Sequence, residues 1–314
     1  MKVIINCQEY PDFELEKQIL RQELNEVEIV ESRTIDPIEF VKEAKGAVVA
    51  MVQYVPITPY VIDSLPECQG YVRNGIGYNN IDAEYAAKKG KYVANVPDYC
   101  IDEVSNHSLA MLLALNRKLV LTHNLVVQGN YKFKAICPIN RLCDTTLGIV
   151  GMGRIGRQLS VKARALVKRI VYYDPCVPQH EFAEKVELDE LCEISHNISL
   201  HVPLTPETEN LINRGLLKKM RPDANIINTA RGGTIDEKTL IDLLKKRKIA
   251  GAGIDVFKNE PIMKNSSFVK LDNVILSNHN AWYSEGALQE VKRSWTFQAV
   301  QIANGQRPKH IRNL

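Results

Sequence analysis

Short apolar runs alternate with polar stretches along the first hundred residues. Val3–Ile5, Val27–Val30, Ala47–Val52 and Gly70–Val72 are rich in aliphatic residues and are predicted to be buried strands. The segments between them, such as Glu14–Leu24, have helical spacing. Alternation of strands with helices predicts a parallel sheet with helices on its faces.

A long, richly apolar helix is predicted next, over Ile101–Leu119. Asp102 and Glu103 lie in its first turn, where acidic side chains interact favourably with the helix dipole. Its length and apolar content suggest that it packs against more than one neighbour. Residues 120–144 are predicted to be a less regular bridge.

Strand and helix patterns then alternate again, with stronger apolar runs. The predicted strands are Leu147–Val150, Ile170–Tyr173, Ile198–His201, Asn225–Asn228, Gly251–Ile254 and Val274–Leu276. Six strands with intervening helices predict one doubly wound sheet. The last thirty residues are predicted to be helical and to end in a polar tail.

Length and composition fit a two-domain globular protein. The chain has 314 residues, 45% of them apolar and 25% charged, with a formal charge of +3. No nucleic-acid partner is expected, because the densest basic run, Lys245–Lys248, falls at the end of a predicted helix. No membrane span is expected, since no stretch approaches about 18 apolar residues. The N-terminus lacks the apolar region of a signal peptide.

The seven cysteines show no disulfide or metal-binding pattern. Their number is odd and none has CxxC spacing, which favours reduced thiols in a cytoplasmic protein. No His/Cys cluster has zinc spacing, so no metal is expected.

A dinucleotide fingerprint follows the first strand of the second series. Gly151, Gly153 and Gly156 form a GxGxxG pattern between a predicted strand and a predicted helix. The glycines would allow a tight turn, close approach of a pyrophosphate and close helix packing. Asp174 ends the next strand, where a carboxylate would bind the ribose hydroxyls of NAD and repel a 2′-phosphate. The alternative is a glycine-rich turn beside a solvated aspartate.

Three polar residues follow later predicted strands. Arg231, Glu260 and His279 each lie just past an apolar run. Carboxyl ends of parallel strands share one edge of a sheet, so the three side chains could converge. Arginine suits a substrate carboxylate, histidine can transfer a proton near neutral pH, and a carboxylate can orient histidine. Taken singly, each could instead be a turn cap, a surface acid or a buried histidine.

The motifs that carry these residues resemble the D-isomer-specific 2-hydroxyacid dehydrogenases. The similar segments are 148–174, 200–206, 228–232, 252–256, the Glu260/His279 pair, and the N-terminal segments 73–82 and 95–97. The segment 279–285 is most similar to the C-terminal-binding-protein corepressors of that family. Asn278 stands where proline is usual, which bears on the stiffness of the His279 loop, and Asn79 stands where aspartate is commoner.

The resemblance implies an α/β architecture and a set of site residues. A doubly wound parallel-sheet NAD-binding domain, residues 99–284, would be inserted into a smaller flavodoxin-like α/β substrate domain, residues 1–98 and 285–314. Arg231, Glu260 and His279 would be catalytic. The cofactor would contact Gly151, Gly153, Arg154, Ile155, Gly156, Asp174, His201, Pro203, Thr208, Thr229, Ala230, Asp255 and Ala281. The substrate would contact Tyr54, Trp282 and the backbone amides of Asn74, Gly75 and Ile76.

The implied reaction is hydride transfer between NAD and a small 2-oxo or D-2-hydroxy acid, in a homodimer built around the helix at 101–119. Two alternatives stay open. One is an NAD-sensing, corepressor-like binding protein, and the other is a formate or phosphite dehydrogenase on the same scaffold.

Overall fold

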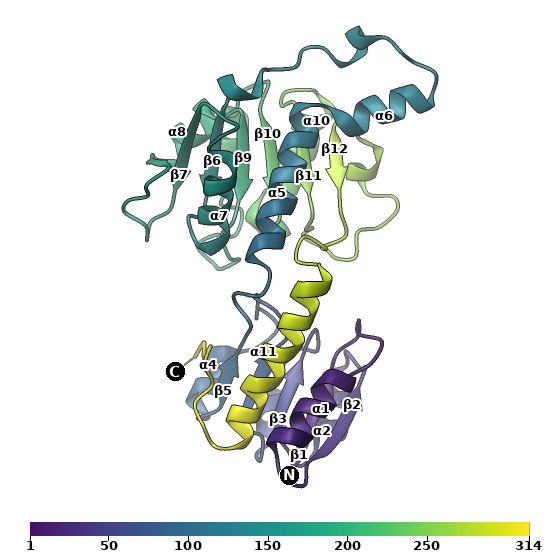
Figure 1. Ribbon diagram of the computed structural model, residues 1–314, viewed down its shortest axis with the longest axis vertical. Helices are drawn as coiled ribbons and strands as arrows, with labels where there is room; N and C mark the ends of the chain where they lie inside the picture. The colour runs from purple at the N-terminus through teal and green to yellow at the C-terminus, as the bar shows by residue number, and fades with distance from the viewer. Residues whose placement is uncertain (314) are drawn as a thin grey trace. The chain divides into compact units, whose positions relative to one another are not determined.

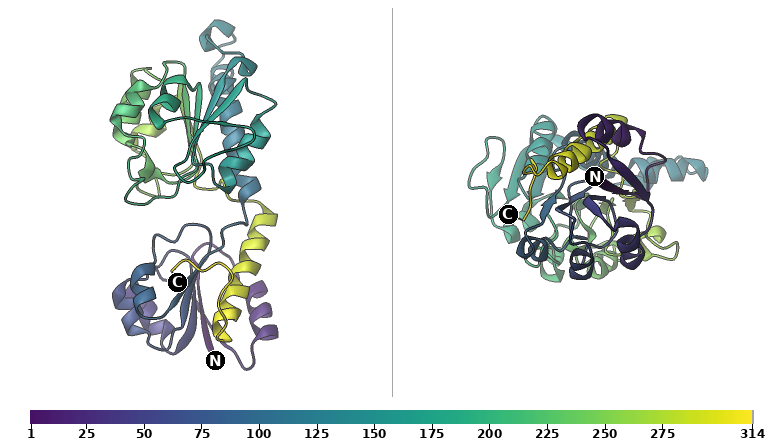
Figure 2. Two further views of the ribbon diagram at one scale, coloured as in Figure 1. Left: turned by 90° about the vertical axis from the view of Figure 1, so that its left-hand side faces the viewer. Right: turned by 90° about the horizontal axis from the view of Figure 1, so that it is seen from below.

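The computed structural model describes residues 1–313, which form two compact units. The first comprises Met1–Cys100 together with the segment from Ser284, and the second comprises Ile101–Tyr283. Each has its own parallel sheet and its own core on both faces of that sheet (Figures 1 and 2).

The first unit has a five-stranded sheet in the flavodoxin-like order β2-β1-β3-β4-β5. The strands are β1 (Lys2–Asn6), β2 (Glu28–Ser32), β3 (Ala47–Val52), β4 (Gly70–Arg73) and β5 (Tyr92–Ala94). α1 (Glu14–Glu23) and α11 (Glu285–Ala303) lie on one face, and α2 (Pro37–Ala44), α3 (Pro59–Ser64) and α4 (Ala83–Lys88) lie on the other. The four predicted strands are present, and the short edge strand β5 was not predicted.

α11 is fixed to this sheet by its largest side chain. Trp295 is fully buried, and its Nε1–H donates a hydrogen bond of 2.7 Å to the carbonyl of Val72 in β4. The helix therefore belongs to the first unit although it lies far from the sheet in sequence.

The second unit has a seven-stranded parallel sheet in the order β12-β11-β10-β9-β6-β7-β8. The strands are β6 (Thr146–Val150), β7 (Arg169–Tyr173), β8 (Glu184–Lys185), β9 (Asn197–Leu200), β10 (Asn225–Asn228), β11 (Gly251–Ile254) and β12 (Val274–Leu276). α5 (Ile101–Asn116) and α7 (Arg154–Ala163) cover one face, and α8 (Leu188–Ile194), α9 (Arg214–Lys219) and α10 (Glu237–Lys245) cover the other (Figure 1).

The doubly wound sheet predicted from the sequence is confirmed. Its six predicted strands are present, and the seventh, β8, was missed because it consists of two exposed charged residues. Strand order reverses between β6 and β9, so the usual ligand position of this fold is at the carboxyl ends of these two strands.

The prediction of one helix over Ile101–Leu119 is wrong at its C-terminal end. α5 ends at Asn116, and Lys118 adopts left-handed backbone angles, with φ 50°. A new helix, α6 (Leu119–Val127), then begins at the last residue of the predicted helix and extends into the region predicted to be irregular. The Asn116 side chain donates to Asn197 at 2.7 Å and to the Leu112 carbonyl at 2.8 Å, which fixes the end of α5.

Within residues 1–313, no single helix has the length and apolar composition of a membrane span. α5 and α6 reach both only when taken together, and they are bent by 56°.

Candidate active site

The glycine-rich turn lies at the switch point of the second sheet. Gly151 has a φ of +95°, which side-chain-bearing residues rarely adopt, and its N–H donates to the Tyr173 carbonyl at 2.9 Å. A Cβ at Gly156 would collide with the Gly151 carbonyl, so glycine permits the close approach of α7 to the turn. A Cβ at Gly153, by contrast, would meet nothing within 4 Å, which leaves open space at the N-terminus of α7.

Asp174 lies at the end of β7 with its carboxylate fastened to the backbone. Oδ2 accepts from the Met152 N–H at 2.8 Å, and Oδ1 accepts from the N–H groups of Cys176 and Val177 at 2.8 and 3.1 Å. The carboxylate is thus fixed beside the glycine turn. The open helix N-terminus and this carboxylate match the pyrophosphate and ribose ends of a dinucleotide.

The other residues expected at the cofactor lie after β9, β10 and β12 and at the start of α7. His201 follows β9, its Nε2 is 2.9 Å from the Ser199 hydroxyl, and desolvation lowers its pKa to about 4. Thr208 closes the following loop with a hydrogen bond of 2.6 Å to the Pro203 carbonyl. Thr229 is buried after β10 and bonds Ser108 of α5 at 2.8 Å. The expected set is completed by Ala230, Arg154, Ile155 and Ala281. Arg154 and Ile155 are the first residues of α7, and Ala281 is buried.

Glu260 and His279 form a close pair. Nδ1 of His279 lies 2.7 Å from Oε2 of Glu260, and Oε1 of Glu260 accepts the Phe257 N–H at 2.8 Å. Burial alone would raise the pKa of Glu260, but these hydrogen bonds and the charges of His279 and Arg231 hold it below its ordinary value. The carboxylate is therefore ionised at neutral pH. With Nδ1 occupied, Nε2 of His279 is the nitrogen available to a substrate.

Arg231 follows β10 in a turn closed by Asn228. The Asn228 side chain donates to the Arg231 carbonyl at 2.9 Å and accepts the Ala230 N–H at 3.0 Å. The charge of Arg231 contributes to the lowered pKa of Glu260. Arg231, Glu260 and His279 follow the carboxyl ends of β10, β11 and β12, which are neighbours in the second sheet.

Asp255 holds the loop that carries His279. It is 1% exposed, and its oxygens accept the N–H groups of Asn280 and Ala281, each at 3.1 Å, and the Ser277 hydroxyl. The His279 N–H donates to the Asp255 carbonyl at 2.8 Å. His279 has a φ of 56°, a strained conformation for a non-glycine residue, and these bonds maintain it.

His107 and Ser277 extend this network, and neither was expected from the sequence. Nε2 of His107 lies 3.0 Å from the Ser277 hydroxyl oxygen. Since that hydroxyl donates to Asp255, its oxygen is left to accept a hydrogen bond from His107. No local motif marks either residue. Only the fold brings α5 beside the residue that follows β12.

In the first unit, one of the three expected amide donors is already used. The Asn74 N–H donates to the Val52 carbonyl at 2.8 Å, which corrects the expectation that this amide would bind a carboxylate. The N–H groups of Gly75 and Ile76 donate to no acceptor within residues 1–313. Tyr54 follows β3, is 45% exposed, and donates its hydroxyl hydrogen to Glu9 at 2.7 Å. Trp282 is half-buried, with its ring edge-to-face against Tyr283.

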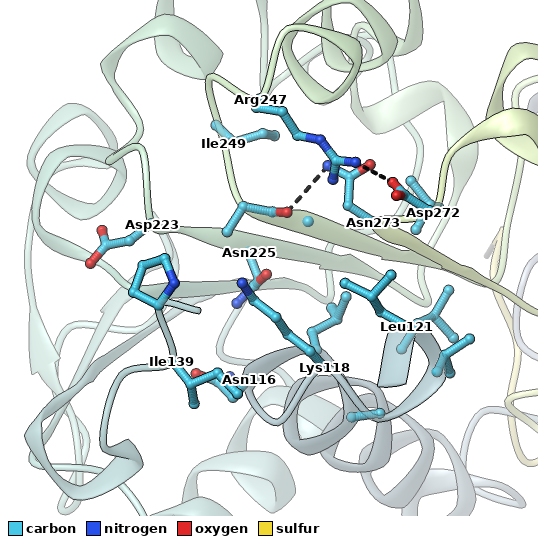
Figure 3. A pocket seen from close by; sticks show the side chains of 18 of the residues that line it. Asn116, Lys118, Leu121, Ile139, Asp223, Asn225, Arg247, Ile249, Asp272 and Asn273 are labelled. Atoms are coloured by element: carbon cyan, nitrogen blue, oxygen red, sulfur yellow. Dashed lines mark hydrogen bonds and ion pairs between the residues drawn. The ribbon is translucent and has the colours of Figure 1, made fainter. Parts of the chain in front are cut away.

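A cavity of about 570 Å³ lies at the opposite edge of the second sheet (Figure 3). Its walls include the first residues of β10, β11 and β12 together with α6 and residues 135–140. None of the expected site residues lines it, because those residues follow the carboxyl ends of the strands. Across residues 1–313, no three His, Cys, Asp or Glu side chains are grouped as metal ligands would be.

Comparison with known proteins defines the class of this chain. Residues 109–281 match the family model described as D-isomer specific 2-hydroxyacid dehydrogenase, NAD binding domain. The chain therefore belongs to the D-isomer-specific 2-hydroxyacid dehydrogenases, a family of NAD-dependent oxidoreductases.

Individual relatives span nearly the whole chain. A glyoxylate reductase of Korarchaeum cryptofilum is 35% identical over 285 residues, which are 88% of this chain and 85% of that protein. A glycerate dehydrogenase of Methylorubrum extorquens is 36% identical over 263 residues, 82% of each chain. The structure of a D-lactate dehydrogenase from Aquifex aeolicus, complexed with NAD and lactic acid, has a TM-score of 0.86 at 26% identity and 96% coverage of both chains.

Proposed function

We propose that this family member reduces small 2-oxo acids to D-2-hydroxy acids with NADH, or catalyses the reverse oxidation, and that Arg231, Glu260 and His279 carry out the chemistry. The observation that carries the proposal is the 2.7 Å contact between His279 and Glu260 at strand ends next to the charge of Arg231. Arginine, histidine and a carboxylate are the groups needed to hold a carboxylate and transfer a proton.

Each residue has a separate task in the reduction. Bound NADH would supply the hydride to the carbonyl carbon. Arg231 binds the substrate carboxylate and polarises the carbonyl through its charge. His279 donates the proton from Nε2 to the carbonyl oxygen, while Glu260 holds Nδ1 and stabilises the imidazolium.

The second unit is proposed as the dinucleotide-binding domain. Gly151, Gly153, Arg154, Ile155 and Gly156 would surround the pyrophosphate, and Asp174 would bind the adenosine ribose. The remaining expected contacts are His201, Pro203, Thr208, Thr229, Ala230, Asp255 and Ala281. Because Asp255 already accepts three donors of the loop that carries His279, its contribution to the nicotinamide site would include fixing that loop.

The first unit is proposed as the substrate-binding domain. The free amides of Gly75 and Ile76 would bind the substrate carboxylate, with the Asn74 side chain nearby and Tyr54 on the adjacent loop. Trp282, three residues after His279, would form a wall for the substrate side chain.

Three further assignments belong to this proposal: a homodimer, a cytoplasmic location and kinship with the corepressor branch. The dimer is supported by α6, which has no buried residue. The exposed apolar residues on it and just beyond it are Leu119, Val120, Val126, Val127, Tyr131 and Phe133. The motif at 279–285 supports kinship with the corepressors, and an NAD-sensing binding protein is therefore the second candidate.

An NADH-oxidation screen against glyoxylate, hydroxypyruvate, pyruvate and longer 2-oxo acids tests the reaction. We expect turnover with at least one small acid and a loss of about 10²- to 10⁴-fold in His279→Ala, the usual contribution of general acid catalysis. Tight NADH binding without turnover would favour the corepressor-like alternative. Reduction of NAD by formate or phosphite would favour the other alternative, a formate or phosphite dehydrogenase on the same scaffold.

A further inference from the structure

Three buried polar atoms without a hydrogen-bond partner lie at one edge of the first unit. They are Oε1 of Gln8, Nε of Arg73 and Nδ2 of Asn74. Gln8 follows β1, Arg73 ends β4, and Asn74 is the next residue. Buried polar atoms are almost always paired in folded proteins, so the two unpaired donors of Arg73 and Asn74, neighbours in the chain at the end of β4, mark this edge as a candidate ligand position. The Gln8 amide is instead directed toward Thr34, after β2.

The same edge contains the switch point of the first sheet. In the order β2-β1-β3-β4-β5, the direction of winding changes between β1 and β3. Ligands of such sheets bind outside the carboxyl ends of the strands at this point. Residues 7–10 follow β1 and residues 53–54 follow β3, so these two loops flank the expected position.

Glu9 provides a fixed carboxylate between these loops. Its Oε2 accepts from Nε2 of Gln53 at 2.6 Å, and its Oε1 accepts from the Tyr54 hydroxyl at 2.7 Å. Gln53 is only 4% exposed, and its own Oε1 accepts from the Cys7 thiol at 3.1 Å and the Gln8 N–H at 3.0 Å. The donor that orients Glu9 is therefore fixed at both ends of its amide.

The loop that carries Glu9 is itself tied down. Arg33 donates to the Cys7 carbonyl at 2.9 Å, to the Pro11 carbonyl at 3.3 Å, and to the Tyr10 carbonyl. The Tyr10 hydroxyl donates to Oδ1 of Asn74 at 2.9 Å, which connects this loop to the one that follows β4. Glu9 and the free amides after β4 thus belong to one connected structure within the first unit.

An ordered but exposed carboxylate has unused acceptor capacity. Glu9 is exposed, and a carboxylate can accept about four hydrogen bonds, of which the protein supplies two. Immobilising a glutamate side chain costs up to about 1.5–2 kcal/mol of conformational entropy. Such fixed groups are typical of binding sites, because a side chain that is ordered before the ligand arrives loses less conformational entropy on binding.

We propose that Glu9, held by Gln53 and Tyr54, is a specificity-determining acceptor that selects 2-oxo acids bearing a hydroxyl group on carbon 3. The inference rests on the proposed function, because the substrate carboxylate must occupy the amides of Gly75 and Ile76. The N–H groups of Gly75 and Ile76 are donors suited to an anion, whereas Glu9 presents only an acceptor. The edge therefore complements a ligand with a carboxylate at one end and a hydrogen-bond donor at the other.

Competing 2-oxo acids would be rejected for two reasons. A methyl group in place of the hydroxyl would desolvate Glu9 without giving it a partner, which is costly for a charged group. A second carboxylate would be repelled by the charge of Glu9. Small 2-oxo acids without the hydroxyl would bind through the carboxylate alone.

Hydroxypyruvate and 2-oxobutyrate form a matched substrate pair, because they differ by a hydroxyl against a methyl group. We expect the wild type to have the higher kcat/KM for hydroxypyruvate. Glu9→Gln and Glu9→Ala should each reduce the hydroxypyruvate/2-oxobutyrate ratio by roughly 10- to 100-fold, the value of a hydrogen bond to a charged group. Glu84→Gln, which removes an exposed carboxylate paired only with Lys88 on α4, is the matched control and should leave the ratio unchanged.

The outcomes separate this inference from the proposed function. If the wild type reduces 2-oxo acids but the ratio is unchanged in both Glu9 variants, Glu9 has no role in selection and the function stands. A lower melting temperature with the same ratio would show that Glu9 only joins the two loops, which also overturns the inference. If the wild type reduces no 2-oxo acid, the proposed function is wrong and the inference falls with it.

Discussion

Replacing Glu260 by glutamine tests the proton donor most directly. Oε1 of Glu260 accepts the Phe257 N–H and Oε2 accepts from His279, so each oxygen has a separate donor. Glutamine has nearly the same shape but only one acceptor oxygen and no charge. The variant therefore removes the anion that stabilises the imidazolium of His279, and it leaves one of the two donors without an acceptor.

The geometry sets the size of the effect. The pair is short, at 2.7 Å, but the side chains of His279 and Glu260 are 42% and 36% exposed, so solvent screens their attraction. Pairs this exposed contribute about 0.2–1 kcal/mol, and 1.36 kcal/mol corresponds to one pH unit. The alkaline limb of the reduction rate should therefore move to lower pH by about 0.2–0.7 units in Glu260→Gln.

The direction of the shift in the pH profile follows from which protonation form of each group is active. Reduction needs protonated His279, and the charged partner favours that form, so removing it makes activity fall earlier as pH rises. On the acidic side, the pKa of Glu260 lies below its ordinary value, so the wild-type pair persists until pH falls through that lowered value. The assay is the pH dependence of kcat/KM for 2-oxo acid reduction. Glu184→Gln, an exposed carboxylate at β8, is the control, and an alkaline limb that did not move in Glu260→Gln would refute the pairing.

Three further predictions concern the cofactor, the substrate carboxylate and the assembly. Asp174→Ala should narrow the preference for NADH over NADPH, since ribose bonds and repulsion of a 2′-phosphate are lost together; equal use of both cofactors by the wild type would contradict this. Arg231→Lys should raise KM and lower kcat for the 2-oxo acid with NADH affinity nearly unchanged, because lysine lacks the planar fork, while Arg169→Lys, on the surface at β7, should match the wild type. Val127→Asp on α6 should shift the mass in sedimentation from dimer toward monomer, and an unchanged mass would place the interface elsewhere.

The fold was predictable where apolar periodicity was strong. The predicted strands of the second sheet contain short apolar runs, and β6, β9, β10 and β11 are buried along most or all of their length, as expected for strands covered on both faces. β8 gave no such signal, because its two residues, Glu184 and Lys185, are charged and exposed. They pair with β7 through the backbone and through an ion pair between Glu184 and Arg169. The break between α5 and α6 could not be predicted either. Apolar residues predominate on both sides of Lys118, so the pattern gives no sign that one helix ends and another begins there.

The candidate site was predictable only as far as motifs reach. Arg231, Glu260 and His279 could be proposed from the sequence because each lies a few residues past a predicted strand. Glu9 and Gln53, however, are neighbours only through the pairing of β1 with β3, and nothing in either local sequence marks them. Contacts between side chains on separate strands depend on register, which a single sequence does not fix.

In the His279 loop, contacts with distant residues restrict the backbone where a local proline would otherwise do so. Asn278 occupies a position where a proline would restrict the backbone, and the sequence alone suggests a looser loop. The structure instead attaches the loop to Asp255 on both sides of His279, through Ser277 before it and Asn280 and Ala281 after it. His107 then ties Ser277 to α5. The left-handed conformation of His279 is therefore maintained by hydrogen bonds to Asp255 and, through Ser277, to His107 of α5. Substitutions at Ser277 should therefore disturb catalysis, although we assign Ser277 no direct contact with the substrate.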